Sequence, residues 1–322
     1  MAANPELRAS VVDLVNKGFS CTEIGVMLSI SMSRAFYFAK RYAGKTNPKH
    51  HRTHNFNQAY FSDINTEENA YWLGMIYSDG SLCVDLKNKS YAVLLGLQES
   101  DKKHLEKICD EIGMEKETIL TEIPNRDIFE NKTNFCRIAF FSKQMVGDLQ
   151  KIGVTSYKSY DACYPTKANI PDHLERRFWR GMIDGDGWLY CSEAGKWNIG
   201  LCGTENMVIS FRAFLTKIDP EILTRKIRFT GSTYEINYSC SWSQRVAKIL
   251  YDNSSVYLER KYQGYLVLRD KLHRITRSRV SKANTDQLSN KNKNQLRKKR
   301  LDQMRAKVGQ PKKEKRPLLY LE

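Results

Sequence analysis

The sequence contains the stretch YWLGMIYSDG at residues 71–80 and repeats it, with substitutions, as FWRGMIDGDG at residues 178–187. Each copy is an apolar segment that we predict to be a helix. Two small residues four positions apart share one face of each copy, Gly74 with Ser78 and Gly181 with Gly185. A face without bulky side chains lets two helix backbones come close. If the copies pack on each other there, Asp79 and Asp186 emerge at one point, and paired carboxylates favour divalent metal chemistry.

The length and composition of the chain limit the classes of protein to which it could belong. A chain of 322 residues is long enough to bury a sizeable core and to hold two or three units. Its 52 Lys and Arg exceed its 36 Asp and Glu, and the net charge of +16 favours a polyanionic partner, nucleic acid before an anionic membrane. No apolar run reaches the length of a membrane span, and no signal-peptide pattern opens the chain, so we expect no membrane contact.

The pattern of the eight cysteines indicates whether the chain resides in a reducing or an oxidising compartment. None of them forms a C-x-x-C pair, and this favours reduced, mostly buried thiols over a disulfide framework. We expect a soluble protein that is cytoplasmic or nucleoid-associated and is encoded by a prokaryote or phage, with an organellar setting as the alternative.

The N-terminal segment, residues 1–44, has the spacing of three short helices between residues 5 and 43. Ser20 and Glu23 make a capping-box pattern at the start of the second helix. The third helix resembles the last helix of resolvase-type helix-turn-helix domains, which enters the major groove. Its outer face would contact DNA through Arg34, Tyr37, Lys40 and Arg41. The alternative is a small helical bundle that only packs on the rest of the chain.

Residues 45–64 have the composition of a basic linker, and two similar segments follow it. Residues 65–162 and 163–270 both follow the order helix, two strands, helix, two strands, helix. We predict that the first helix is capped by Asn65 with Glu68 in one repeat, and by Asp172 with Glu175 in the other. The sequence thus predicts an α+β fold made of two tandem repeats.

Residues 271–322 form a basic tail. By count it holds 17 Lys and Arg against 4 Asp and Glu, so +13 of the net charge lies there. Few apolar residues are available to bury, so we expect a disordered segment or a helix that orders on nucleic acid, with contacts from Arg297 and Lys298. The alternative is a solubilising tail.

Over about residues 56–270 the doubled motif is similar to that of the LAGLIDADG homing endonucleases, in their single-chain form. The lead-in AYWLG at 70–74 and the later YLERK at 257–261 are also typical of this family. The resemblance implies a pseudo-two-fold fold in which the two motif helices pack at the centre. The strands of each repeat would form a saddle-shaped antiparallel sheet that lies along the major groove of DNA.

The resemblance also implies a metal site. The last aspartate of each motif, here Asp79 and Asp186, would bind Mg²⁺, and the backbone carbonyls of Ser78 and Gly185 would assist. The metals would polarise the scissile phosphates and stabilise the leaving 3′ oxygen.

Other residues are carried over by order and context. Lys158 and Lys261 match the basic residues beside the family's site, where a lysine would stabilise charge on the phosphorane or orient the network of the attacking water. Ordinary phosphate contact is the alternative role. Gln98, at the end of a strand, is a candidate for holding the attacking water. Along the strands and their ends we expect DNA contacts from Arg137, Lys143, Lys226 and Arg228.

The two copies differ at two positions. The family's earlier acidic residue is Asp184 in the second copy but Tyr77 in the first, and Arg180 stands where the first copy has Leu73. Such halves would suit a non-palindromic target.

We therefore predict a monomeric, Mg²⁺-dependent homing endonuclease that makes double-strand breaks across the minor groove of a long, asymmetric DNA target. It would be encoded by an intron or another mobile element. Two alternatives remain: an RNA maturase that binds intron RNA, and an inactive DNA-binding regulator on the same fold.

Overall fold

The computed structural model describes residues 5–47, 55–124, 134–156, 162–166, 169–193 and 195–270, together with residues 295, 298 and 299. The chain divides into two compact units, Met1–Leu268 and Arg269–Glu322. In the second unit Lys298 is exposed, whereas Arg297 and most of the predicted basic tail lie outside the described residues. Among the helices that are described, none combines the length and apolarity needed to cross a membrane.

The N-terminal segment folds as predicted into three short helices, followed by a π-helical turn: α1 (Pro5–Asn16), α2 (Cys21–Met27), α3 (Met32–Phe38) and Ala39–Ala43. The predicted capping box of α2 is confirmed. The hydroxyl of Ser20 accepts a hydrogen bond from the Glu23 amide at 3.4 Å, and the Glu23 carboxylate accepts one from the Ser20 amide at 2.8 Å.

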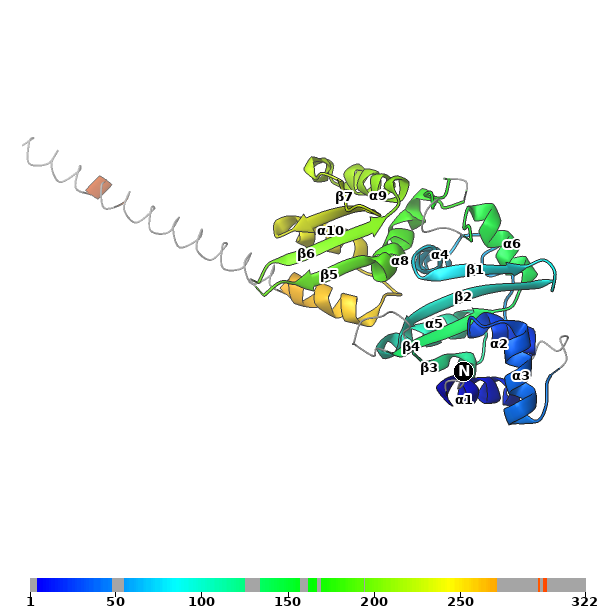
Figure 1. The fold of residues 1–322 in the computed structure, drawn as a ribbon. Coiled ribbons are helices and arrows are strands. Elements are labelled where there is room, and N and C mark those ends of the chain that lie inside the picture. The colour runs from blue at the N-terminus through cyan, green and yellow to red at the C-terminus, as the bar shows by residue number, and fades with distance from the viewer. Residues whose placement is uncertain are drawn as a thin grey trace, which may run out of the picture. The chain divides into compact units, whose positions relative to one another are not determined.

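Two repeats of one α+β unit follow, in the predicted order of elements (Figure 1). The first contains α4 (Glu67–Ser78), β1 (Gly80–Asp85), β2 (Ser90–Gln98), α5 (Lys102–Ile112), β3 (Leu120–Pro124), β4 (Asn134–Phe140) and α6 (Lys143–Ile152). The second contains α8 (Glu175–Asp186), β5 (Gly187–Cys191), β6 (Trp197–Gly203), α9 (Glu205–Ile218), β7 (Arg228–Phe229), β8 (Tyr234–Ser239) and α10 (Ser241–Tyr251). A further helix spans 259–270.

Each repeat builds one four-stranded antiparallel sheet. The strand orders are β1-β2-β4-β3 and β5-β6-β8-β7, so the second sheet repeats the topology of the first. Gly80 lies opposite Leu95 in the first sheet, and Gly187 lies opposite Leu201 in the second. The strand that follows each motif helix therefore begins at an equivalent place in its sheet.

Helix α5 shows how the local sequence sets these boundaries. Its buried residues include Leu105, Ile108 and Ile112, which share one face at helical spacing. Gly113 ends the helix with φ of +73°, a left-handed conformation that favours glycine. The end of α5 was predicted from this pattern and is confirmed.

Both predicted caps of the motif helices are wrong. Helix α4 is capped one residue later than expected, because Thr66 and Asn69 form the reciprocal box, with bonds of 3.1 and 3.0 Å. Helix α8 begins only after a 3₁₀ turn at Asp172–Leu174, and its N-cap makes no side-chain bond. The turn makes Glu175 the first helical residue, and its buried carboxylate accepts hydrogen bonds from Tyr164 and Lys217 instead.

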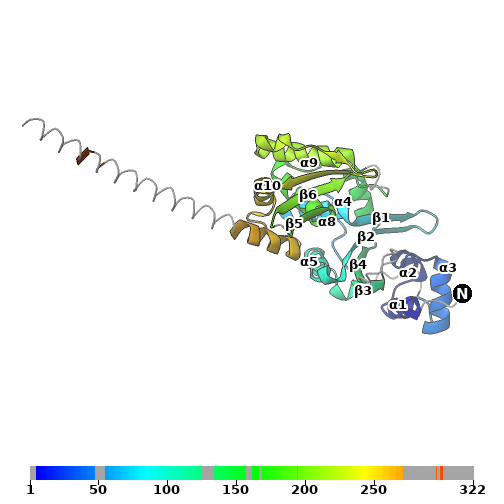
Figure 2. The ribbon, with the colours of Figure 1, turned by 60° about the vertical axis from the view of Figure 1, so that its left-hand side comes forward.

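The main core surrounds helices α4 and α8, which lie side by side between the two sheets (Figure 1). Both helices are buried along most of their length. The first sheet is covered on its other face too, where the N-terminal helices pack against β2, β3 and β4 (Figure 2). The resemblance implied that the sheet of each repeat lies along DNA, and in the first repeat the N-terminal helices occupy the outer face of the sheet.

Candidate active site at the ends of the central helices

The two motif helices cross at a pair of glycines. A Cβ atom placed on Gly74 would collide with the carbonyl oxygen of Phe178 and lie 3.0 Å from the Cα of Gly181. A Cβ on Gly181 would meet the carbonyl oxygen of Tyr71 and the Cα of Gly74 in the same way. Only glycine fits on either side, so the predicted close approach of the two backbones is confirmed.

The close approach continues to the C-terminal ends of both helices. There a Cβ on Gly185 would collide with the side chain of Ser78 and lie 2.8 Å from Oδ2 of Asp79. The carboxylate that ends α4 therefore reaches the last turn of α8, one residue before Asp186. The C-terminal ends of α4 and α8, which carry Asp79 and Asp186, therefore lie together, as the doubled motif led us to expect.

Each aspartate ends its helix at the surface. Asp79 is the exposed C-cap of α4, and Asp186 is the half-buried last residue of α8. A helix C-terminus carries partial negative charge, so two such ends add to the two carboxylates. The resulting electrostatic field attracts a cation.

The donor set fits a hard divalent cation. In the ranges that the structure describes, no group of three or more His, Cys, Asp or Glu side chains is placed to hold a metal. Two carboxylates at one point match Mg²⁺, which takes oxygen ligands and keeps waters or phosphate oxygens as the rest. The Sγ of Cys202 donates to the backbone carbonyl of Asp186 at 3.1 Å. Burial raises the pKa of Cys202, which keeps it a neutral thiol.

Lys261 lies behind the Asp186 turn. Its ammonium group is buried and donates to the carbonyl oxygens of Ile183 at 2.5 Å, Asp184 at 2.8 Å and Gly187 at 2.7 Å. An ammonium has three N–H donors, so all are used within the chain. In this structure Lys261 fixes the end of α8, and its role in the reaction stays a prediction. Its predicted counterpart Lys158 lies outside the described residues.

Burial lowers the pKa of Lys261 to about 8. The nearby carboxylates of Asp184, Asp79 and Asp186 oppose this effect, because negative charge favours the ammonium form. Lys261 is therefore coupled electrostatically to both aspartates of the candidate site.

Gln98 is less well placed than predicted. It is exposed at the end of β2 and lies opposite Phe135 of β4, three residues beyond Leu95, which faces the first residue of β1. By register, the position next to the aspartate is Gly96 in the first sheet and Cys202 in the second. Cys202 was not among the predicted site residues, although the register of β5 with β6 places it opposite Asp186.

A buried polar network joins the two motif helices. Asp184 accepts hydrogen bonds from the hydroxyls of Tyr71 at 2.7 Å and Tyr251 at 2.6 Å, and from the amide of Leu258 at 2.7 Å. Burial raises the pKa of Asp184. Because Tyr71 gives its only proton to Asp184, the 2.8 Å bond to His104 must be donated by Nε2–H. Burial lowers the pKa of His104 to about 3, so its ring is neutral.

The two asymmetric positions have different structural roles. Tyr77, which replaces the first acidic residue, is buried and donates to the carbonyl of Ile152 at 3.3 Å. Arg180 is also buried, donates to the carbonyl of Leu250 at 3.1 Å, and lies over the ring of Tyr71 at 5.5 Å. Arg180 and Asp184 therefore serve the packing of α8, and neither is exposed to a ligand.

The predicted DNA contacts are mostly exposed, with one exception. Arg137 donates to the carbonyl of Met27 at 2.7 Å, which ties β4 to α2. Arg137 thus has a packing role between the first sheet and the N-terminal helices, and its contact with DNA stays a prediction. The other predicted residues with described side chains are exposed, although Arg228 pairs with Glu235: Arg34, Tyr37, Lys40, Arg41, Lys143, Lys226, Arg228 and Lys298.

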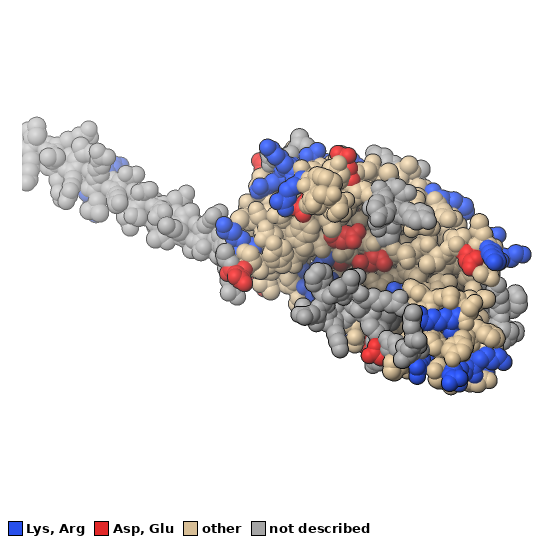
Figure 3. Space-filling model, viewed as in Figure 1, with Lys and Arg blue, Asp and Glu red and all other residues tan. Residues whose placement is uncertain are grey.

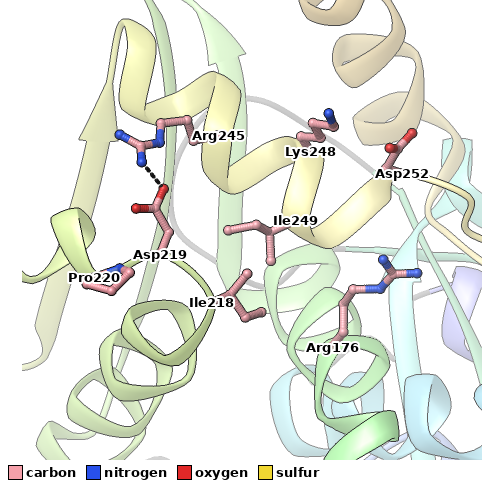
Figure 4. Close-up of a pocket in the computed structure, with 8 residues that line it drawn as sticks. All are labelled: Arg176, Ile218, Asp219, Pro220, Arg245, Lys248, Ile249 and Asp252. Atoms are coloured by element: carbon pink, nitrogen blue, oxygen red, sulfur yellow. Dashed lines mark ion pairs between the residues drawn. The ribbon is translucent and has the colours of Figure 1, made fainter.

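The surface in Figure 3 carries acidic side chains near its middle, with Lys and Arg over the N-terminal helices. A separate pocket lies among the C-terminal end of α9, helix α10 and α8 (Figure 4). Its lining includes Arg176, Lys248 and the ion pair of Arg245 with Asp219, but neither aspartate of the candidate site. This pocket is therefore not part of the site.

No protein-family model and no curated protein sequence matches the chain. Among solved structures, it is similar to the homing endonuclease I-WcaI bound to its DNA recognition sequence, with 15% identity over 62% of this chain and 87% of that one, and a TM-score of 0.42. The LAGLIDADG meganuclease I-CpaMI bound to uncleaved DNA has 11% identity over 67% and 93%, and a TM-score of 0.41.

The LAGLIDADG meganuclease I-AabMI bound to uncleaved DNA has 11% identity over 64% of this chain and 91% of that one, and a TM-score of 0.40. Overlap at this level leaves the function to be judged from the residues of this chain. By its doubled motif, its repeated sheet order and its crossed central helices, the chain resembles the single-chain LAGLIDADG homing endonucleases.

Proposed function

We propose that the chain is a site-specific DNA endonuclease that hydrolyses both strands of a long, asymmetric target across the minor groove. One observation carries this proposal. Asp79 and Asp186 end two helices that cross with glycine against glycine, so one chain presents two carboxylates at a single point. A single chain with both carboxylates has no need of a partner copy, which supports a monomer.

The residues divide into ligands and supports. Asp79 and Asp186 would hold Mg²⁺, with the backbone carbonyls of Ser78 and Gly185 beside them. The bound cation supplies Lewis-acid polarisation of the phosphate and activation of water. Lys261 fixes the turn that carries Asp186, through its bonds to Ile183, Asp184 and Gly187. The backbone that carries Asp186 would therefore be held in place before the substrate arrives.

Charge supports DNA as the substrate. The net charge of +16 favours a polyanion, and the exposed basic residues of α3 and the following π-helical turn offer phosphate contacts. The acidic centre would repel phosphate in the absence of a cation. We therefore expect DNA binding to depend on surrounding basic residues, and cleavage to depend on Mg²⁺.

The test is incubation of the full chain and Mg²⁺ with a library of duplex DNA, followed by sequencing of the cut ends. Asp79→Asn and Asp186→Asn should each abolish double-strand cleavage while binding survives, because an amide keeps the shape but loses the charge. Asp110→Asn, an exposed carboxylate on α5, is the matched control and should cut normally. Normal double-strand cleavage by either site variant would refute the metal assignment.

A DNA-binding regulator on the same fold is the second candidate. One observation favours it: Lys261 is fully engaged by carbonyls of its own chain. Sequence-selective binding without cleavage in Mg²⁺ would support the regulator over the nuclease.

A further inference from the structure

Strand β2 is apolar on both faces. Val93, Leu95 and Leu97 are buried and point to the main core. Ala92 and Leu94, which alternate with them, point the other way and are buried in a second cluster. A continuous apolar run of this kind is typical of a strand that is covered on both sides.

The cover of the outer face is the N-terminal helical segment, as Figure 1 and Figure 2 both show. Ala92, Leu94, Leu120 and Ala139 of the sheet share one cluster with apolar residues of the three helices: Val11, Leu14, Val15, Ile24, Met27, Leu28 and Phe38. The bond from Arg137 to the carbonyl of Met27 joins the same two layers.

The covered face of the first sheet is poorly suited to reading DNA bases. Alanine and leucine side chains have neither hydrogen-bond donors nor acceptors. In the major groove the bases are distinguished mainly by hydrogen bonds to donors and acceptors on their edges. Exposing a buried leucine such as Leu94 also costs roughly 1.5–3 kcal/mol in hydrophobic free energy. The outer face of the first sheet is therefore built to bind the N-terminal helices.

The outer face of the second sheet differs in chemistry. Trp188 lies over Gly200, where a Cβ would collide with its ring, and its indole N–H donates to Oδ1 of Asn237 at 3.0 Å. The amide of Asn237 in turn faces Asn198 at 3.4 Å, and Tyr190 is 51% exposed. Asparagine amides offer both donors and acceptors, which suits the edges of base pairs.

Helix α3 presents a second surface of this kind. Ala35 and Phe38 face the cluster that holds the segment on the sheet, while Phe36 and Tyr37 are 49% and 54% exposed. Arg34 is exposed on the same short helix. Large exposed aromatic side chains next to an arginine suit a nucleic-acid surface.

We infer that two different elements read the two halves of the DNA target. The outer face of β5, β6 and β8 reads one half-site, and α3 reads the half-site next to the first repeat, in place of the covered sheet face. This inference rests on the proposed function, because it assumes a duplex DNA target. It adds that α3, and not the sheet of the first repeat, recognises the bases of that half-site.

The experiment selects binding sites for the full chain from a random duplex DNA library and repeats the selection with variants. Asn237→Ala should lower the preference for one base over the others by about tenfold at a few neighbouring positions of the target. Tyr37→Ala and Arg34→Ala should lower the base preference at a separate block of positions, on the other side of the centre of the target. Arg137→Ala, on the covered face, should leave both blocks unchanged, with melting temperature checked for every variant.

The outcomes separate the two proposals. Failure of the wild-type chain to enrich any sequence would contradict the proposed function, and the inference with it. Enrichment would support DNA recognition, and the variants then decide how it works. The inference is overturned if the Tyr37 and Asn237 variants relax the same base pairs, or if Arg137→Ala relaxes a block of its own.

Discussion

Alanine in place of Gly74 tests whether the crossing of α4 and α8 sets the candidate site. The new Cβ would lie 3.0 Å from the Cα of Gly181 and collide with the carbonyl of Phe178. Carbon atoms prefer about 3.5–4.0 Å, so the helices must part by roughly 0.5–1 Å. Backbone atoms on both sides of the contact cannot rotate away as a side chain can.

The size of the effect follows from two opposing terms. Overpacking of a buried contact costs about 1–3 kcal/mol. Replacing a helical glycine by alanine returns about 0.5–1 kcal/mol through backbone entropy. We expect Gly74→Ala to lower the free energy of unfolding by about 1–2 kcal/mol. Parting the helices also separates Asp79 from Asp186, so cleavage should fall by at least about tenfold, because misplacement by 1 Å is costly in catalysis.

Urea unfolding and DNA cleavage should be measured in parallel, with Gly147→Ala as the control. Gly147 lies in α6, and a Cβ there meets no atom within 4 Å. That variant should be more stable than the wild type by up to about 1 kcal/mol and should cut normally. If Gly74→Ala is as stable as the wild type and cuts DNA at the same rate, the glycine crossing does not position the aspartates.

Three further predictions concern buried groups and a cap. The unfolded chain binds the Lys261 proton more tightly than the folded chain, because burial lowers its pKa from 10.5 to about 8. The free energy of unfolding should therefore rise by about 2 kcal/mol from pH 8 to 10 relative to Lys261→Met, and equal pH slopes in urea unfolding would contradict this. Tyr251→Phe removes a bond to the buried Asp184 and should cost about 2 kcal/mol, whereas the exposed Tyr190→Phe should cost almost nothing. Ser20→Ala breaks the capping box of α2 and should lower the free energy of unfolding by about 1 kcal/mol; an unchanged urea midpoint would count against a role for this cap.

The centre of the fold was predictable because its determinants are local and repeated. Gly74 and Gly181 mark a bare helix face by spacing alone, and the aspartate follows each at the same distance. Turn signals such as Gly113 fixed where helices end. These features depend on a few neighbouring residues, so they can be read without knowing the tertiary structure.

What could not be predicted depends on contacts between distant residues. The bonds that bury the Lys261 ammonium could not be predicted, because the carbonyls that accept them lie more than 70 residues earlier in the chain. The bond from Tyr71 to Asp184 spans 113 residues. The cover on the first sheet did have a signal, since Ala92 and Leu94 fill positions where a half-exposed strand would carry polar side chains. Such a pattern favours a covered strand over one that lies along DNA.

The covered sheet also bears on how the chain folds during synthesis. Val11 and Ala139 share one cluster although they stand 128 residues apart, and the N-terminal helices leave the ribosome long before β4 exists. Their apolar side must then wait, exposed, until the first sheet is complete, and such surfaces are prone to aggregate. The N-terminal helices, made before the first repeat, become buried on one side only when the first sheet has formed against them.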